Sequence, residues 1–284
     1  MHTFSRICVC YCVDIYQWTK EFYESVTTEK LVIGKSVFGR DIFAVKIGEG
    51  EPVGIVQYAI HGREYITARL ARVHYEVGTA QGSCWLLPLV NPDGALLAEV
   101  GLSSIPKEKR ETLLALNGGK KDFFLWKANG NGVDLNVNFA ARWGKGEKNV
   151  RAAGRENYIG KTPFSEPETR ALRTFTEKVR PAYTVSYHTK GEEIYWYFYQ
   201  PIRACCRDKR LALALSESTG YPLRYARGSV GGYKDWCIQR YGIPAFTIEA
   251  GKDVFSHPLG EREFVDVAEK NRYALYRLSE EMEK

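Results

Sequence analysis

Two histidines and two glutamates occur where their side chains could act on one centre. His61 and Glu64 are three residues apart directly after a short apolar run, and His188 and Glu249 each follow a further apolar run. Two histidines and one glutamate, with a fourth position left open for water, form the ligand set of catalytic zinc. A promoted-water mechanism also needs a carboxylate that accepts a proton from water. We therefore predict that His61, Glu64 and His188 hold one zinc ion per chain and that Glu249 is the general base.

Each of these residues also has a simpler interpretation. A short His-x-x-Glu pattern often arises by chance, and His188 could be a hydrogen-bonded histidine of the core. Glu249 could be a buried carboxylate paired with a cation. However, a glutamate within the apolar segment 246–250 is costly to bury without a charged or metal partner, which favours a functional role. His74 and His257 lack such a context and are predicted to lie on a helix face and in a loop.

The apolar runs that precede the candidate residues are typical of buried β-strands. We expect strands at 53–60, 84–90, 182–187 and 245–248. The second of these ends in Asn-Pro-Asp-Gly at 91–94, which predicts a turn. Because ligand sites of α/β sheets gather at the carboxyl ends of the strands, the four residues are expected to meet at one edge.

Helical patterns separate these runs. Apolar residues spaced three and four apart predict a helix that begins near Arg63, and 211–215 and 261–281 are also expected to be helical. Ser165 and Glu168 form a capping-box pattern that predicts the start of a helix reaching about Val179. Strands that alternate with helices predict an α/β domain with a largely parallel central sheet.

Composition excludes several other classes of protein. The chain has 284 residues, 44% of them hydrophobic, and a formal net charge of +6, which is ordinary for a globular protein and not for a disordered or disulfide-based one. No apolar run approaches the roughly 18–20 residues that cross a bilayer. No basic stripe interleaved with aromatic residues is present, so we expect no nucleic-acid partner. The positive charge is compatible with an anionic substrate.

The N-terminal segment is predicted to stand apart from the catalytic domain. Cys8, Cys10 and Cys12 alternate as they would on one face of a strand, but thiolate zinc sites usually use two separated pairs, so their role stays open. The start of the chain lacks a charged region and a small-residue cleavage site, which predicts a cytoplasmic protein. We expect residues 1–29 to form a segment of uncertain role and residues 30–284 to form the domain that carries the candidate zinc site.

Five ordered motifs resemble the zinc carboxypeptidases of the carboxypeptidase A-like fold. They occupy residues 61–67, 91–94, 133–139, 187–188 and 246–249. The resemblance implies a single three-layer α/β/α domain with a mixed, mostly parallel eight-stranded sheet. It also implies the zinc ligands and base named above. Asp134, in the family's Asp-x-Asn position, would orient His61, as carboxylates commonly do for zinc-bound histidines.

The chain departs from this family at the positions that grip a substrate's terminal carboxylate. Typical members carry an arginine where this sequence has Val137, although the preceding Asn136 is kept. No arginine occurs near Gly130 or Asn131, where one that stabilises the oxyanion is expected, and Ile238 occupies the place expected for a substrate-facing tyrosine. Valine cannot replace a bidentate arginine–carboxylate pair. Removal of a free C-terminal residue in the usual pose is therefore not expected.

Residues 188–196 resemble a bacterial subgroup that cleaves γ-D-glutamyl-diaminopimelate bonds in cell-wall peptides. The resemblance predicts a zinc metallopeptidase acting on such peptides, with a muropeptide as its partner and an oligomeric state left open. Arg63, Asn136, Arg142 and Lys190 are tentative substrate-binding residues; for the basic ones the alternative is a solvated surface charge. The competing functions are a conventional metallocarboxypeptidase with an altered carboxylate site, a zinc-binding homologue without catalysis, and a related zinc deacylase or amidase.

Overall fold

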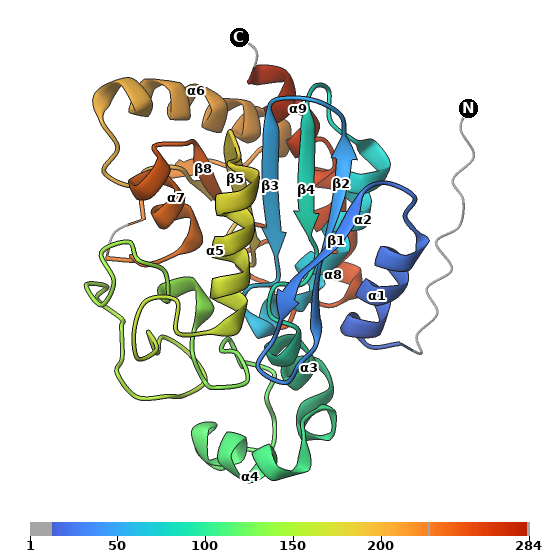
Figure 1. The fold of residues 1–284 in the computed structure, drawn as a ribbon, viewed down its shortest axis with the longest axis vertical. Coiled ribbons are helices and arrows are strands. Elements are labelled where there is room, and N and C mark those ends of the chain that lie inside the picture. Colours follow the sequence, from blue (N-terminus) through green and yellow to red (C-terminus); the bar gives the residue numbers. More distant parts are fainter. Residues whose placement is uncertain (1–12, 227, 283–284) are drawn as a thin grey trace.

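An eight-stranded mixed sheet forms the centre of the molecule in the computed structural model, which describes residues 13–226 and 228–282 (Figure 1). The strands are β1 (Lys30–Lys35), β2 (Asp41–Gly48), β3 (Val53–Tyr58), β4 (Ser83–Leu87), β5 (Tyr183–His188), β6 (Glu193–Tyr195), β7 (Leu223–Arg224) and β8 (Ala245–Glu249). Their order across the sheet is β1-β2-β4-β3-β5-β8-β6-β7. The central pairs β4–β3, β3–β5 and β5–β8 are parallel, whereas β1–β2, β2–β4 and β8–β6 are antiparallel. The predicted mixed, mostly parallel sheet is confirmed.

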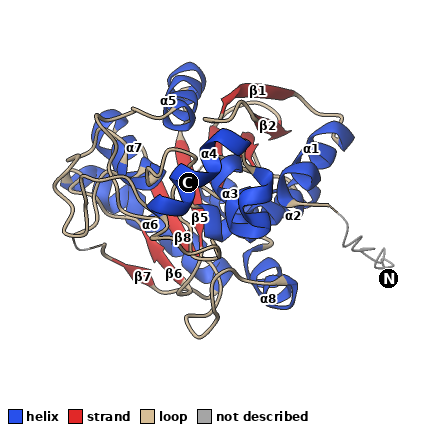
Figure 2. Ribbon diagram, turned by 90° about the horizontal axis from the view of Figure 1, so that it is seen from below, coloured by secondary structure: helices blue, strands red, loops and turns tan. Residues whose placement is uncertain are grey.

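Helices cover both faces of this sheet, as the three-layer prediction requires. They are α1 (Ile15–Ser25), α2 (Leu70–Val77), α3 (Pro92–Val100), α4 (Lys107–Leu116), α5 (Pro167–Val179), α6 (Ile202–Thr219), α7 (Tyr233–Tyr241), α8 (Glu261–Asn271) and α9 (Ala274–Glu281). Successive strand residues point to opposite faces, so Ile55 packs in the core beneath α5 and α7. Val56 packs in the other core, with residues of α2, α6, α8 and α9. In Figure 2, α5 lies above the central strands β5 and β8, and α8 lies on their lower side.

The segment after β3 is not the regular α-helix that its periodicity predicts. Gly62–Arg69 is a 3-10 helix that leads into α2, and Glu64 within it has non-helical backbone angles (φ −102°, ψ 21°). Apolar spacing alone does not distinguish these two kinds of helix. The predicted closing helix is likewise divided, into α8 and α9.

The predicted capping box of α5 is wrong. The helix begins at Pro167 with Glu166 as its N-cap, and neither residue of the predicted box caps it. Glu168 cannot reach back to the helix start because its two carboxylate oxygens accept hydrogen bonds from the Val37 backbone N–H (3.1 Å) and the Asn129 side chain (3.0 Å). A distant part of the chain therefore overrides the local pattern.

Near the N-terminus, α1 packs against the helices beside the sheet. Its first backbone N–H, at Ile15, donates to Glu99 of α3 at 2.8 Å. The proposed division at residues 29 and 30 stays a prediction, and Cys8, Cys10 and Cys12 lie outside the described residues. In the described part of the chain no helix is both long and apolar enough to cross a membrane.

His74 provides a test of the core beneath α2. Its ring is 1% exposed, with Nε2 3.0 Å from the Asn271 carbonyl oxygen and Nδ1 2.7 Å from the Tyr58 hydroxyl. Since a carbonyl only accepts, Nε2 carries the proton and Nδ1 accepts from Tyr58. Burial lowers the pKa of His74 from 6.5 to about 4.

We expect this histidine to make the folded state less stable in acid. Between pH 6.5 and about 4 the unfolded chain binds a proton that the folded chain does not, so the free energy of unfolding falls as the pH falls, by up to about 3 kcal/mol from this group. Urea unfolding of the wild type and His74→Gln over pH 4–7 checks this. The variant should lose less stability across that range; parallel pH profiles would contradict the assignment.

Candidate metal centre

The three central parallel strands bring the predicted metal ligands and base to one edge of the sheet. His61 follows β3 by three residues, and His188 and Glu249 are the last residues of β5 and β8. His188 and Glu249 are direct partners in the β5–β8 register. Figure 1 shows β3 running beside β4 toward the same lower edge. The carboxyl-edge arrangement expected from the sequence is confirmed.

Close backbone packing fixes the loop that carries His61. The Gly62 backbone N–H donates to the Lys127 carbonyl at 2.9 Å, and that of Arg63 donates to the Trp126 carbonyl at 2.7 Å. A Cβ at position 62 would lie 2.4 Å from the Gly94 carbonyl oxygen, so only glycine fits there. The loop after β3 is therefore clamped between two other segments.

The Asn-Pro-Asp-Gly motif forms part of this clamp rather than a free turn. Asn91 is the N-cap of α3, and its side-chain oxygen accepts from the Gly94 backbone N–H at 2.9 Å. Its side-chain nitrogen donates to the carbonyls of Ile60 and Ala128, both at 3.1 Å. One buried asparagine thus joins the loop that carries His61 to the loop that carries Lys127.

The side chains of His61, Glu64 and His188 converge in a buried cluster. Nδ1 of His61 lies 2.9 Å from Glu64 Oε1, and Nδ1 of His188 lies 2.9 Å from Glu64 Oε2. The two Nδ1 atoms are 3.1 Å apart, and the exposed fractions of the three residues are 6%, 3% and 1%. Within residues 13–226 and 228–282 this is the one group of three or more such side chains that could hold a metal. Two imidazoles and one carboxylate directed at one point are the donors that catalytic zinc prefers.

A carboxylate and an ammonium lie next to this cluster. Asp134 Oδ1 is 3.2 Å from His61 Nε2, and its Oδ2 is 3.3 Å from the Lys127 Nζ. Burial alone would raise the pKa of Asp134, but the charges of Lys127 and His61 hold it well below its usual range. Asp134 therefore stays ionised and directs the Nδ1 of His61 toward the cluster. The sequence indicated Asp134 through the resemblance, but it did not indicate that Lys127 pairs with it.

Glu249 lies beside the cluster in a different environment from Glu64. Burial would raise the pKa of Glu64, but the two neighbouring histidines hold it well below its usual value. Burial raises the pKa of Glu249 to about 7; His188 opposes this shift and Glu64 adds to it. A carboxyl group with a pKa near 7 can both accept and release a proton at neutral pH.

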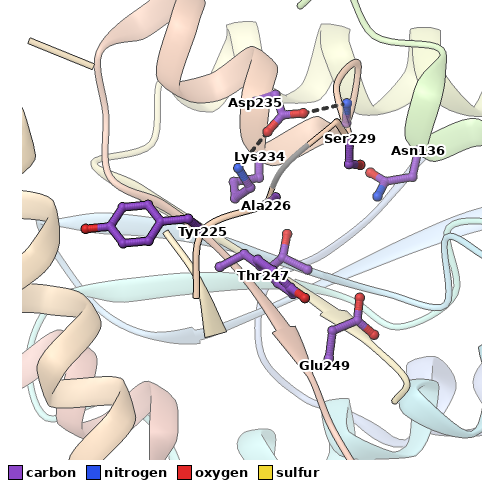
Figure 3. Close-up of a pocket in the computed structure, with 10 residues that line it drawn as sticks. Asn136, Tyr225, Ala226, Ser229, Lys234, Asp235, Thr247 and Glu249 are labelled. Carbon is purple, nitrogen blue, oxygen red and sulfur yellow. Dashed lines mark hydrogen bonds and ion pairs between the residues drawn. The ribbon is translucent and has the colours of Figure 1, made fainter. Parts of the chain in front are cut away.

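A cavity of about 250 Å³ opens beside Glu249 (Figure 3). Asn136, which lines it, has its side-chain nitrogen 3.5 Å from His188 Nε2 and accepts from the Tyr233 backbone N–H at 3.2 Å. The other lining residues are Tyr195, Tyr225, Ala226, Ser229, Gly232, Lys234, Asp235 and Thr247. The cavity thus extends from the predicted base to the N-terminus of α7.

The three basic residues predicted to bind substrate do not line this cavity. Arg63 lies 3.7 Å from Glu156, and Lys190 lies 3.1 Å from Asp253. Arg142 stacks over the Tyr199 ring at 4.4 Å and lines a second cavity. Their substrate roles stay predictions.

Among the described residues that line the first cavity, the only cation is Lys234. Sequence reasoning missed this lysine because nothing in its local pattern shows that its side chain is buried. Ile238, in the place expected for a substrate-facing tyrosine, is 4% exposed in the core. Tyr225 is the exposed tyrosine that lines the cavity.

Residues 79–274 match the protein family described as zinc carboxypeptidase. The γ-D-glutamyl-L-diamino acid endopeptidase 1 of Lysinibacillus sphaericus is 31% identical over 250 residues, which cover 81% of this chain and 62% of that protein. The murein peptide amidase A of Escherichia coli K12 is 37% identical over 123 residues, covering 39% of this chain and 46% of the amidase. Bovine thrombin-activatable fibrinolysis inhibitor, solved with a tick carboxypeptidase inhibitor, has the same fold, with a TM-score of 0.70, 20% identity and 94% of each chain covered.

The chain therefore spans less than two thirds of the length of these two sequence relatives. The family match begins after His61 and Glu64, whereas His188 and Glu249 lie within it. The structure joins the two parts, because it places His61 and Glu64 in contact with His188.

Proposed function

Because this chain belongs to the zinc carboxypeptidase family, we propose that it is a zinc-dependent peptidase that hydrolyses an amide bond of bacterial cell-wall peptides of the γ-D-glutamyl-diaminopimelate type. The observation that carries the proposal is the buried cluster of His61, Glu64 and His188 beside Glu249. A non-catalytic homologue has no need for a carboxylate beside its metal ligands that is not itself a ligand.

Each residue has one part in the proposed reaction. His61, Glu64 and His188 hold the zinc ion, which when bound acidifies a water molecule and polarises the carbonyl under attack. Glu249 accepts the proton of the attacking water and then passes it to the leaving amine. Asp134 keeps the ring of His61 oriented, and Asn136 positions the substrate at the mouth of the cavity. The raised pKa of Glu249 suits both halves of its task.

The substrate class follows from a relative and from one missing side chain. A relative at 31% identity carries the name of a γ-D-glutamyl-L-diamino acid endopeptidase. Conventional members of the family have an arginine at the position of Val137, and this arginine binds the free terminal carboxylate of the substrate. With valine there, a substrate that continues beyond the cleaved bond leaves no arginine without its carboxylate partner. We therefore favour, as the substrate, a peptide that is recognised through carboxylates other than the one at its C-terminus.

A panel of three peptides separates this proposal from its alternatives. Zinc-loaded protein is incubated with a γ-D-glutamyl-diaminopimelate peptide, an ordinary peptide with a free C-terminus, and the same ordinary peptide amidated at its C-terminus. Mass spectrometry should show cleavage of the first. Trimming of only the free ordinary peptide would favour a conventional carboxypeptidase. Intact peptides in all three samples, with zinc bound, would favour a non-catalytic protein.

Lys127 is expected to replace the missing oxyanion arginine. Burial would lower the pKa of Lys127, but Asp134 and Glu64 raise it above its usual value, so the ammonium stays charged next to the metal centre. We predict that Lys127→Met lowers kcat about a hundredfold, the usual cost of losing one oxyanion donor. Lys127→Arg should restore part of the rate. Zinc content is measured in both variants, since equal loss of zinc and of rate would instead indicate a role through Asp134.

A further inference from the structure

The second cavity, of about 380 Å³, has no part in the proposed reaction. The buried side chains of Phe198 and Ile238 give it an apolar wall. Arg142 and Tyr199 also line it, and the guanidinium of Arg142 lies 4.4 Å from the centre of the Tyr199 ring. The remaining lining residues are Gln200, Pro201 and Gln239. The cavity therefore combines an apolar wall with one cation.

A row of three tyrosine rings connects this cavity to the one beside Glu249. Tyr225 lines the first cavity, and Figure 3 shows its ring pointing away from Glu249. The ring centre of Tyr197 lies 5.5 Å from that of Tyr225 and 5.9 Å from that of Tyr199, which lines the second cavity. Tyr225 and Tyr199 are 59% and 65% exposed, so both ends of the row face solvent. A chain that leaves the first cavity can therefore pass over the tyrosines to the second.

The backbone holds the stacked pair of Arg142 and Tyr199 in an unusual conformation. Both residues have left-handed backbone angles, with φ of 47° and 55°, which residues other than glycine rarely adopt. The Gln200 side chain closes the turn at Tyr199: it accepts from the Phe198 backbone N–H at 2.6 Å and donates to the Trp196 carbonyl at 3.1 Å. Left-handed angles persist where surrounding contacts impose them, and they cluster at binding and active sites. The geometry of the pair is thus consistent with a preformed binding site.

Arg142 begins a loop that carries an excess of positive charge. Residues 142–151 include four cations, Arg142, Lys145, Lys148 and Arg151, and one carboxylate, Glu147. In the part of the chain that the structure describes, none of these four cations forms an ion pair. An arginine without a carboxylate partner in the protein can bind a carboxylate of a ligand through two parallel hydrogen bonds. The second cavity is therefore suited to a peptide segment that carries a carboxylate.

We propose, on the basis of the function proposed above, that Arg142 binds a side-chain carboxylate in the part of the substrate that follows the cleaved bond. Asn136 stands at the family's position for the end of the substrate beyond that bond, and it lines the first cavity. The continuing chain starts there, passes over the three tyrosines and brings its carboxylate to Arg142. Each step of the row is a little shorter than two extended residues, so the carboxylate lies roughly two to four residues beyond the one at Asn136.

Pairs of amidated peptides test this second binding site without any turnover. Each peptide begins with γ-D-glutamyl-diaminopimelate and continues with glycines, among which one residue is aspartate or asparagine. That residue occupies the first, second, third or fourth position after diaminopimelate. Because the C-terminus is amidated, the aspartate carboxylate is the only charge that differs within a pair. Calorimetry measures the dissociation constants with zinc-loaded Glu249→Gln protein, which is expected to leave the peptides intact.

We expect the aspartate peptide to bind about fivefold more tightly than its asparagine partner at one or more of the second to fourth positions. This is the effect of one charge pair at a partly exposed site. At the first position the two peptides should bind equally, because the carboxylate does not reach Arg142. Added salt should reduce the preference, since it screens exposed charges.

Two substitutions of arginine in the same loop separate the second cavity from the general charge of the loop. Arg142→Gln should bring the two dissociation constants of every pair close to equality. Arg151→Gln is the matched control: Arg151 also lies over an aromatic ring, that of Trp143 at 5.7 Å, but it does not line the second cavity. The control should keep the preference for aspartate. Thermal unfolding verifies that each variant is folded.

Equal binding within all four pairs, a preference confined to the first position, or no binding of any peptide would overturn the proposal. So would a preference that survives Arg142→Gln or disappears in Arg151→Gln. Cleavage by the wild type is scored separately. A protein that cleaves the γ-D-glutamyl peptide but shows no preference within the pairs retains the proposed function and loses the second site. A protein that shows the preference but cleaves none of the peptides retains the second site and loses the proposed function.

Discussion

Replacing Glu249 with glutamine is expected to reduce peptide hydrolysis by at least about a hundredfold, within the range that general acid–base catalysis contributes. Glutamine keeps the size of the side chain but cannot accept the proton of the attacking water. Because Glu249 is not one of the clustered ligands, the variant should bind as much zinc as the wild type. Steady-state rates and elemental analysis of the same preparations measure both quantities.

Glu217→Gln, at an exposed position of α6, is the control for removal of a negative charge. It should leave both rate and zinc content unchanged. Undiminished hydrolysis by the Glu249→Gln protein would show that another group is the base. Loss of zinc from that protein would instead place Glu249 among the ligands.

Replacing His188 with alanine is expected to abolish stable zinc binding. His188 contributes one of the two Nδ1 atoms of the cluster, and its removal leaves one imidazole and one carboxylate. Loss of a residue that merely orients a zinc ligand already weakens metal binding by about 10–100-fold, so loss of a ligand itself should exceed that range. Elemental analysis after dialysis should find zinc in the wild type and none in the variant.

Thermal unfolding gives a second readout for the same variant. A metal that binds only the folded state raises the melting temperature. Added zinc should therefore stabilise the wild type and not the His188→Ala protein. His74→Gln is the control, because His74 is a buried histidine outside the cluster and its loss should leave zinc binding intact. One zinc per chain in dialysed His188→Ala protein would contradict the assignment.

The sequence predicted well those parts of the fold that depend on a local pattern of residues, such as an uninterrupted apolar run. The strand expected at 245–248 is observed at Ala245–Glu249, and that expected at 182–187 at Tyr183–His188. Uninterrupted apolar runs are buried on both faces of a parallel sheet, which makes their ends easy to recognise. A histidine or glutamate at such an end must then lie at the carboxyl edge. The convergence of His61, Glu64 and His188 could be predicted for this reason.

The parts that were not predicted depend on contacts between distant segments. Glu168 binds Val37 and Asn129 instead of capping its own helix, and no local pattern reveals this. Lys127 was expected near the oxyanion, but its pairing with Asp134 was not predicted. Lys234 is an ordinary lysine in the sequence, and only the packed structure shows that it is buried beside Asp235. The strands β6 and β7, of three and two residues, are too short for periodicity to indicate.

The most direct test of the central claim is the mass of the products formed from a γ-D-glutamyl-meso-diaminopimelate peptide by zinc-loaded wild type and Glu249→Gln protein. We predict that the wild type releases the fragment that begins with diaminopimelate, by hydrolysis of the γ-glutamyl bond, and that the variant leaves the peptide intact. An intact peptide after incubation with wild-type protein that holds one zinc ion per chain would contradict the account.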